Sequence, residues 1–334
     1  MATTSPLLAL PTVRDDLVRV ERALREAVVA DDPFLTEVAS HLIEAGGKRG
    51  RPAFAIGSAA TAQPTMAPVT NDVVLGSVSV ELVHLGSLYH DDVMDEASTR
   101  RTVESVNAKW GNLQAILAGD FLLARASEVA ASLGTEVAGL LAATIGKLCE
   151  GQVLELQDTY NVARSEQRYF ASIAGKTASL YATSCRIGAL TARLPRDQVD
   201  ALTEFGLAYG MAFQIVDDVL DLCATDEQLG KPAGHDLIEG VYTLPVIRTV
   251  ARGDGAGRRL EAMLGRTMPE TDMREARAIV RASGELEASL AAAQGQVLAA
   301  SRALAPFASS QGSCALVGAA EHLLESVSAI ATAA

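Results

Sequence analysis

Apolar residues recur every three or four positions along most of the chain, and this spacing is typical of amphipathic helices. No stretch alternates apolar and polar residues for long enough to predict a sheet. Glycine and proline separate the periodic segments, as at Gly46-Gly47 and Pro195. We therefore predict helices at residues 12–30, 34–45, 52–62, 71–95, 112–132, 135–157, 166–174, 176–193, 196–224, 240–252, 270–283, 285–304 and 309–330.

Two of these helices, residues 71–95 and 196–224, are long and apolar, so we expect them to lie buried at the centre of a bundle. No linker is long enough, or biased enough in composition, to divide the chain. The sequence therefore predicts a single all-α domain over residues 1–334.

Composition and charge narrow the possible functions. Of the 334 residues, 49% are apolar and 4% aromatic, so Ala, Leu and Val must build most of the core. A net charge of -13 argues against nucleic acid as a partner, because a phosphate backbone requires a basic surface. The four cysteines form no CxxC pair, and neither a signal peptide nor a transmembrane segment is predicted. We expect a soluble, cytoplasmic protein with reduced thiols.

The two long apolar helices both end in the pattern DDxxD. Its carboxylates share one helix face, near a C-terminal end whose dipole disfavours anions, so they repel one another unless a cation binds. Carboxylate oxygens suit Mg²⁺, which is commonly held by one or two carboxylates together with substrate phosphates. A solvated helix end would explain one cluster, but the repetition favours a magnesium site for a diphosphate. The predicted metal ligands are Asp91, Asp92 and Asp95, and Asp217, Asp218 and Asp221.

Basic residues are grouped near both clusters, although the chain is acidic. Each group alone would be ordinary solvated surface, but together they favour a shared anionic ligand. The glycine turn AGGKRGRP, residues 45–52, could also bind an anion through backbone N–H groups. The candidates are Lys48, Arg49 and Arg51 in this turn, Arg100 and Arg101 after the first cluster, Lys176 beside Thr177, and Lys231 after the second cluster.

The segments GGKRGRP, ELVHLGSLYHDDVMDEASTRR, GDFLLARA, GKTASLY, FQIVDDVLD and GKPAGHDLIEGVYTLP occur in the order found in trans-isoprenyl diphosphate synthases, and the chain resembles this polyprenyl synthetase family over residues 40–250. The resemblance implies an all-α bundle around a central active-site cavity, usually a homodimer. It implies head-to-tail condensation of isopentenyl diphosphate with an allylic diphosphate, and about three Mg²⁺ ions per site.

The resemblance also assigns roles to single residues. Both aspartate clusters would bind Mg²⁺ at the allylic diphosphate, with Asp217 a direct ligand. The allylic diphosphate would be held by Arg100, Lys176 and Lys231, and the reacting centre would be lined by Thr177 and Gln214. The isopentenyl diphosphate site would contain Lys48, Arg51, His84 and Arg101, with Arg49 nearby. Without this context, His84 would be an ordinary core histidine. The chain departs from the family where Val241 replaces a common lysine and Gly50 a branched residue.

Product length depends on the apolar wall before Asp91. In the family, an aromatic residue four or five positions before this aspartate closes the tunnel, whereas this chain has Ser87 and Gly86 there and Val83 one turn further back. An open wall predicts about seven to ten isoprene units, because one unit spans about one helix turn. The alternative is that Gly86 only permits close helix packing. Product release would involve a transient membrane contact.

Three other functions remain as alternatives. A short-chain farnesyl or geranylgeranyl diphosphate synthase would have a blocked tunnel. A terpene cyclase would lack the GGKRxRP turn and one aspartate cluster. A non-catalytic binding subunit would have lost aspartates from one cluster, whereas both are intact here.

Overall fold

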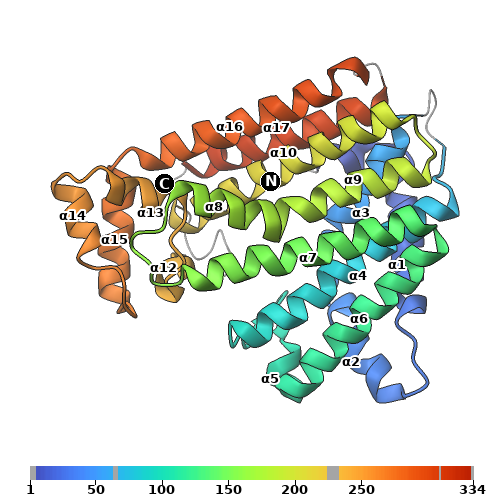
Figure 1. Cartoon of the computed structure of the whole chain (residues 1–334), viewed down its shortest axis with the longest axis horizontal. Helices are drawn as coiled ribbons and strands as arrows, with labels where there is room; N and C mark the ends of the chain where they lie inside the picture. Colours follow the sequence, from blue (N-terminus) through green and yellow to red (C-terminus); the bar gives the residue numbers. More distant parts are fainter. Residues whose placement is uncertain (1–4, 63–66, 224–232, 308–309, 332–334) are drawn as a thin grey trace. The chain divides into compact units, whose positions relative to one another are not determined.

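The computed structural model describes residues 5–62, 67–223, 233–307 and 310–331. Two compact units divide the chain, the first comprising Met1–Ile145, Leu180–Gly206 and Leu304–Leu316, and the second Gly146–Ser179, Leu207–Ala303 and Val317–Ala334. Each unit is almost entirely helical where it is described, which confirms the predicted all-α class (Figure 1). The single domain over residues 1–334 stays a prediction.

The first unit is built from the N-terminal helices and one short hairpin. Its elements are η1 (Pro6–Ala9), α1 (Val13–Ala27), α2 (Pro33–Glu44), α3 (Gly50–Ala60), α4 (Asn71–Met94), β1 (Thr99–Arg100), β2 (Val103–Glu104), α5 (Val106–Trp110), α6 (Asn112–Ser132) and η3 (Ala305–Phe307).

The second unit holds the elements α8 (Glu166–Ile173), the π-helical turn η2 (Ala174–Ala178), α12 (His235–Glu239), α13 (Leu244–Ala251), α14 (Gly255–Glu261) and α15 (Glu270–Ala282). Five helices contribute residues to both units: α7 (Thr135–Gln157), α9 (Ser179–Thr191), α10 (Arg196–Cys223), α16 (Glu285–Leu304) and α17 (Gln311–Ala331).

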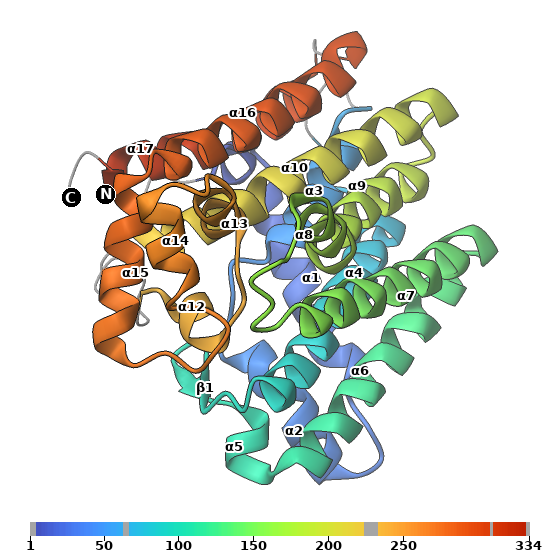
Figure 2. The same cartoon turned by 60° about the vertical axis from the view of Figure 1, so that its left-hand side comes forward.

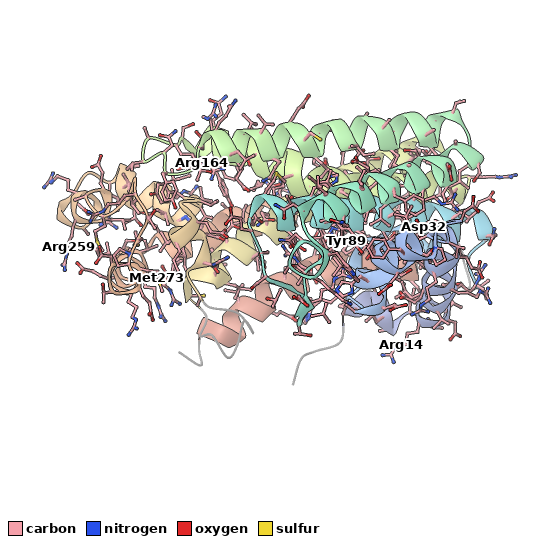
Figure 3. The ribbon with its side chains drawn as sticks, turned by 90° about the horizontal axis from the view of Figure 1, so that it is seen from below. Arg14, Asp32, Tyr89, Arg164, Arg259 and Met273 are labelled. Atoms are coloured by element: carbon pink, nitrogen blue, oxygen red, sulfur yellow. The ribbon has the colours of Figure 1, made fainter. Side chains whose placement is uncertain are left out.

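Helix α4 is the buried centre of the first unit. It packs side by side with α6, and α1 and α3 cover other parts of it (Figures 1 and 2). Residues on nearly all sides of α4 are buried, as expected for a core helix. Tyr89 lies inside this unit, where its hydroxyl donates to the Val38 carbonyl oxygen of α2 at 2.8 Å (Figure 3). Tyr89 is therefore directed at α2.

The core of the second unit includes residues of α10 and α13. Val216, Val219 and Leu222 of α10 pack in one cluster with Leu244 and Val246 of α13. Pro245 occupies the first turn of α13, where the missing N–H costs little. This apolar layer supports the acidic end of α10.

Two helices are long and apolar enough to span a membrane by length and composition alone, α4 and α7. In α4, 72% of the apolar window is buried inside the protein, as in the core helix of a soluble fold. In α7 the share is 22%, so much of its apolar surface faces outward. The absence of a membrane-spanning segment therefore stays a prediction.

Several small elements differ from the predicted set. The hairpin β1–β2, the short helices α5, α12 and α14, and the π-helical turn were not predicted. The hairpin turn uses Arg101 and Thr102 with φ of 52° and 66°, a left-handed conformation that usually selects glycine or asparagine. Without those residues the turn gives no sequence signal.

Candidate active site

The first aspartate cluster lies at the C-terminal end of α4, in the first unit. Asp92 is fully buried, Asp91 is half-buried, and Asp95, the residue that ends the helix, is exposed. The Asp95 N–H donates to the Asp91 carbonyl oxygen at 2.8 Å, which fixes the last turn. The three carboxylates therefore leave the helix within one turn, at its unfavourable dipole end.

Arg100 pairs with the buried carboxylate of this cluster. Its Nε and Nη2 atoms lie 2.7 and 2.5 Å from Asp92 Oδ1, and the hairpin β1–β2 brings the guanidinium back to α4. Burial raises the pKa of Asp92, while the hydrogen bond and charge of Arg100 lower it. Asp92 Oδ2 is buried and accepts no hydrogen bond from the described residues. One carboxylate oxygen is thus available to a cation.

The glycine turn that precedes α3 has an unusual backbone. Gly46 and Gly47 have φ of 82° and 153°, and Arg49 adopts a left-handed φ of 46°. Lys48 is exposed at its tip. The Arg51 guanidinium lies 4.8 Å from the ring centroid of Tyr181, a cation–π contact.

His84 lies on α4, about two turns before Asp91. Burial first, and then the positive charges of four nearby arginines, hold the pKa of the His84 imidazole well below its usual range. The imidazole is therefore neutral at pH 7. The four arginines are Arg49, Arg51, Arg100 and Arg101. Three of them, Arg49, Arg51 and Arg101, are predicted at or near isopentenyl diphosphate, whereas Arg100 is predicted at the allylic diphosphate.

The second aspartate cluster lies near the end of α10, in the second unit. Asp217 is exposed, whereas Asp218 and Asp221 are buried. The Asp221 carbonyl oxygen accepts the Gly234 N–H at 2.8 Å, and its Oδ2 accepts the Asp236 N–H at 3.4 Å. Asp221 therefore fastens the start of α12 to the end of α10.

Asp218 is the centre of a hydrogen-bonded chain. Its Oδ2 accepts the Tyr169 hydroxyl at 2.6 Å, and its Oδ1 accepts Gln214 Nε2 at 2.8 Å. The Thr177 hydroxyl donates to Gln214 Oε1 at 2.8 Å. Burial raises the pKa of Asp218 to about 7, even though the hydrogen bonds lower it. One hydrogen-bonded chain thus joins the predicted residues Thr177, Gln214 and Asp218. Tyr169 also belongs to it, although the sequence did not suggest this residue.

Lys176 lies in the π-helical turn η2, a type of irregularity that is frequent at functional sites. Its Nζ is 2.5 Å from Glu155 Oε1 of α7. The turn packs closely on α7, because a Cβ at Gly175 would lie 2.9 Å from the Gly151 Cα. Glu155 was not predicted, because the pairing joins residues far apart in sequence. Lys231, the remaining predicted cation, lies outside the described residues.

The predicted chain-length wall is mixed in character. Val83 is fully buried, and the half-buried Ser87 donates its hydroxyl to the His84 carbonyl oxygen. Gly86 packs against α6, since a Cβ there would lie 3.1 Å from both the Gly119 carbonyl oxygen and Leu123 Cγ. Gly86 therefore fits the close-packing alternative, and the role of all three positions in product length stays a prediction.

The residues present fit a magnesium-bound diphosphate. Among the described residues, no three His, Cys, Asp or Glu side chains form a group that could hold a metal ion. Mg²⁺ commonly takes one or two carboxylates and completes its shell with water and phosphate oxygens. Asp91 and Asp217 are accessible carboxylates, and Asp92 offers a buried oxygen without a hydrogen-bond donor in the described chain. The metal would thus depend on substrate for part of its coordination.

Comparison with known proteins identifies the class. The family description "Polyprenyl synthetase" matches residues 32–281. The heptaprenyl diphosphate synthase component 2 of Geobacillus stearothermophilus is 42% identical over 80% of this chain and 81% of its own. The nonaprenyl diphosphate synthase of Mycobacterium tuberculosis is 40% identical, covering 81% and 80%. A polyprenyl synthase structure from Caulobacter crescentus, complexed with calcium and isoprenyl diphosphate, has a TM-score of 0.88 at 34% identity, covering 96% of both chains.

These similarities extend over most of the chain and agree with the two aspartate clusters and their basic neighbours. The protein belongs to the polyprenyl synthetase family, whose members are prenyltransferases.

Proposed function

We propose that this protein condenses isopentenyl diphosphate head-to-tail with an allylic diphosphate, farnesyl or geranylgeranyl, and releases diphosphate. The product is a long all-trans polyprenyl diphosphate of about C35–C50, on the scale of one isoprene unit per helix turn. The observation that carries the proposal is the match to the family over residues 32–281, in a chain that retains both DDxxD clusters. The relatives named for heptaprenyl and nonaprenyl products support the long chain.

The residues of the two units divide the chemistry. Arg100, Lys176 and Lys231 bind the allylic diphosphate, and bound Mg²⁺ supplies further neutralisation of the leaving group. Asp91 and Asp217 are its accessible carboxylate ligands. The polar chain through Thr177 and Gln214 orients fixed dipoles, which cost no reorganisation as positive charge develops on the allylic carbon.

Isopentenyl diphosphate binds to Lys48, Arg51 and Arg101, and the neutral His84 supplies a hydrogen bond without adding charge. The isopentenyl double bond attacks the allylic carbon, and the proton that is then lost goes to the departed diphosphate. No side-chain base is required. The buried apolar surface of α4 keeps water away from the reacting carbon.

Product length follows from the small residue Ser87 near the site. Gly86→Tyr would be a poor test of the tunnel, because the added ring would push α4 away from Gly119 and Leu123 of α6. Ser87→Phe is the better test, since Ser87 is half-buried and its hydroxyl donates within its own helix turn, to the His84 carbonyl oxygen.

We also propose a homodimer in the cytoplasm, with a transient membrane contact for product release. Helix α6 exposes Leu113, Ile116 and Leu117 by 73%, 41% and 64%, and α7 exposes Val153 and Leu156 by 50% each. Each set lies on one face of its own helix, and we propose that a second copy of the chain covers the set on α6. None of the four cysteines, all of which lie in the described part of the chain, forms a disulfide, which fits a reducing compartment.

Diphosphate release separates the candidate functions. The purified chain is incubated with farnesyl diphosphate and Mg²⁺, with and without isopentenyl diphosphate. A synthase releases diphosphate only when both substrates are present, and EDTA abolishes the release. Release from the allylic substrate alone would indicate a cyclase. Absence of release with both substrates would indicate a binding subunit and would refute the proposal.

A further inference from the structure

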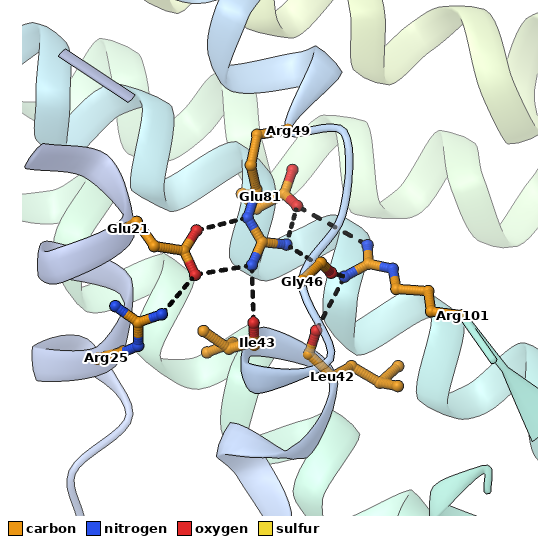
Figure 4. A network of polar contacts seen from close by, with 8 residues as sticks. All are labelled: Glu21, Arg25, Leu42, Ile43, Gly46, Arg49, Glu81 and Arg101. Atoms are coloured by element: carbon orange, nitrogen blue, oxygen red, sulfur yellow. Dashed lines mark hydrogen bonds and ion pairs between the residues drawn. The ribbon is translucent and has the colours of Figure 1, made fainter. Parts of the chain in front are cut away.

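Two carboxylates and three guanidinium groups form a network inside the first unit (Figure 4). Arg49 lies between Glu21 of α1 and Glu81 of α4, and Glu81 lies between Arg49 and Arg101. Glu81 is 1% exposed and Arg49 7%, so this is a buried network. Arg25 also contacts Glu21, with its Nη2 3.2 Å from Glu21 Oε1, so three positive charges face two negative charges in this network.

Every N–H group of Arg49 has an acceptor. Its Nε and Nη2 atoms donate to the two Glu21 carboxylate oxygens at 2.7 and 3.0 Å, a bidentate pair. Nη2 also donates to the Ile43 carbonyl oxygen at 3.0 Å, and Nη1 donates to Glu81 Oε1 at 3.1 Å and to the Gly46 carbonyl oxygen at 3.4 Å. A guanidinium has five N–H donors, so Arg49 has none left for a diphosphate.

Arg49 and Arg101 together also bind the C-terminal end of α2. Arg101 Nη1 donates to the carbonyl oxygens of Leu42, at 2.9 Å, and Gly46, while Arg49 takes Ile43. Helix ends leave such carbonyl groups without partners, and cations are favourable there. All hydrogen bonds that Arg101 makes with described residues run through Nη1, so its other nitrogens face no acceptor within hydrogen-bond distance in that part of the chain.

The glycine turn is shaped around these guanidinium groups. A Cβ at Gly47 would lie 2.9 Å from Arg101 Cζ, closer than real Cβ contacts allow. Burial raises the pKa of Glu81 above its ordinary value, and the charges of Arg49, Arg51 and Arg101 oppose part of that rise. Its negative charge thus offsets the repulsion among arginines that are gathered in one place.

We propose that Glu21, Glu81 and Arg49 are positioning residues, which hold the turn and Arg101 in the geometry that binds isopentenyl diphosphate. The inference rests on the proposed function and changes the role of Arg49, which the sequence placed near the substrate. Glu21 lies before residues 32–281, so the family match does not include it. The N-terminal helix α1 therefore takes part in building a substrate site through Glu21, whose carboxylate accepts two hydrogen bonds from Arg49.

A buried ion-pair network could instead serve only the stability of the fold, because burial of charges is itself costly. The two roles predict different kinetics. If the network only stabilises the fold, weakening it lowers the melting temperature and leaves the Michaelis constants of the folded fraction unchanged. If the network positions the substrate site, weakening it raises the Michaelis constant for isopentenyl diphosphate. The Michaelis constant for the allylic substrate then stays within twofold of the wild-type value.

The test compares Glu21→Gln and Glu81→Gln with the control Glu26→Gln. Glu26 is on the same helix as Glu21, but its side chain is 71% exposed and pairs only loosely with Arg22, at 3.9 Å. We expect each network variant to raise the Michaelis constant for isopentenyl diphosphate about tenfold, equivalent to ~1.4 kcal/mol. The control should equal the wild type. Unchanged constants in Glu21→Gln, whose half-buried position favours folding, would overturn the inference even if Glu81→Gln does not fold.

Calorimetric binding of isopentenyl diphosphate separates this inference from the proposed function. If the wild type binds it but produces no polyprenyl product, the proposed function fails, and weaker binding by Glu21→Gln still supports the positioning role. If Glu21→Gln binds as tightly as Glu26→Gln, the positioning role is wrong whatever the activity. Arg49→Lys should also bind weakly, because one ammonium cannot replace the bidentate pair with Glu21.

Discussion

The Tyr169 hydroxyl donates to Asp218 Oδ2 at 2.6 Å, and Tyr169→Phe removes this donor without changing the shape of the ring. Tyr169 is 1% exposed and Asp218 4%, so water cannot easily replace the hydroxyl. A buried hydrogen bond to a charged group contributes about 1.5–3 kcal/mol. We therefore expect Tyr169→Phe to lower the free energy of unfolding by about 1.5–3 kcal/mol when Asp218 is ionised.

The size of this loss should depend on pH. The pKa of Asp218 is raised to about 7 in the folded protein, above its unfolded value of 3.8. An acid with a raised pKa binds its proton more tightly when folded, so its ionisation reduces stability as pH rises through about 7. The hydrogen bond from Tyr169 lowers this pKa, so removing it costs most above pH 7 and less near pH 5.5, where Asp218 is protonated in both variants.

Urea unfolding at pH 8.0 and pH 5.5, with EDTA present, measures both quantities. Tyr242→Phe is the control, because Tyr242 is similarly buried but its hydroxyl oxygen accepts from a neutral group, the Gly265 N–H, at 2.6 Å. We expect the control to lose about 0.5–1.5 kcal/mol at both pH values. Equal losses of unfolding free energy for Tyr169→Phe at the two pH values would refute the conclusion that the Tyr169 hydroxyl stabilises the ionised form of Asp218. A loss no larger than the control's would refute it too.

Four further predictions follow from the site and the helix surfaces. Ser87→Phe should shorten the product, on the scale of about one isoprene unit for each helix turn of tunnel that the ring closes. Chromatography of the dephosphorylated alcohols measures the length, and an unchanged length would place the tunnel floor elsewhere. Because the pKa of His84 is lowered in the folded protein, the unfolded chain binds more protons below pH 6.5, and the wild type loses up to ~1.4 kcal/mol of stability per pH unit there. His84→Gln should remove this loss. Parallel curves of unfolding free energy against pH for the two proteins would contradict the prediction. Arg100→Lys should raise the Michaelis constant for the allylic substrate about tenfold, since lysine cannot supply two nitrogens to one carboxylate, and unchanged kinetics would exclude Arg100 from that site. Leu117→Glu should produce monomers in sedimentation, unlike Val18→Glu, an equally exposed position on α1; dimers in both variants would exclude α6 as the interface.

Local sequence patterns predicted the helices well, because apolar spacing and breakers act within one element. The helix predicted at 71–95 is α4, and that at 135–157 matches α7 at both ends. The predicted helix 176–193 begins as α9 only at Ser179, because the turn before it is π-helical and close glycine packing shapes it. The hairpin carrying Arg100 gave no signal, since its left-handed residues are arginine and threonine.

The site could be predicted as a set of residue types but not as a set of partners. The DDxxD spacing identified Asp92 and Asp218, yet nothing local shows that one pairs with Arg100 and the other with Tyr169. The same holds for Glu21 and Glu81, which appear in the sequence as ordinary helix acids and meet Arg49 only through folding. Long-range pairing depends on how helices pack, and periodicity does not encode it.

The most direct measurement is the size of the product made by the purified chain from farnesyl diphosphate, excess isopentenyl diphosphate and Mg²⁺. Prenyl alcohols of about C35–C50 that disappear on chelation are the predicted result. Alcohols that stop at C15 or C20, or turnover that persists when divalent metal is removed, would contradict the account.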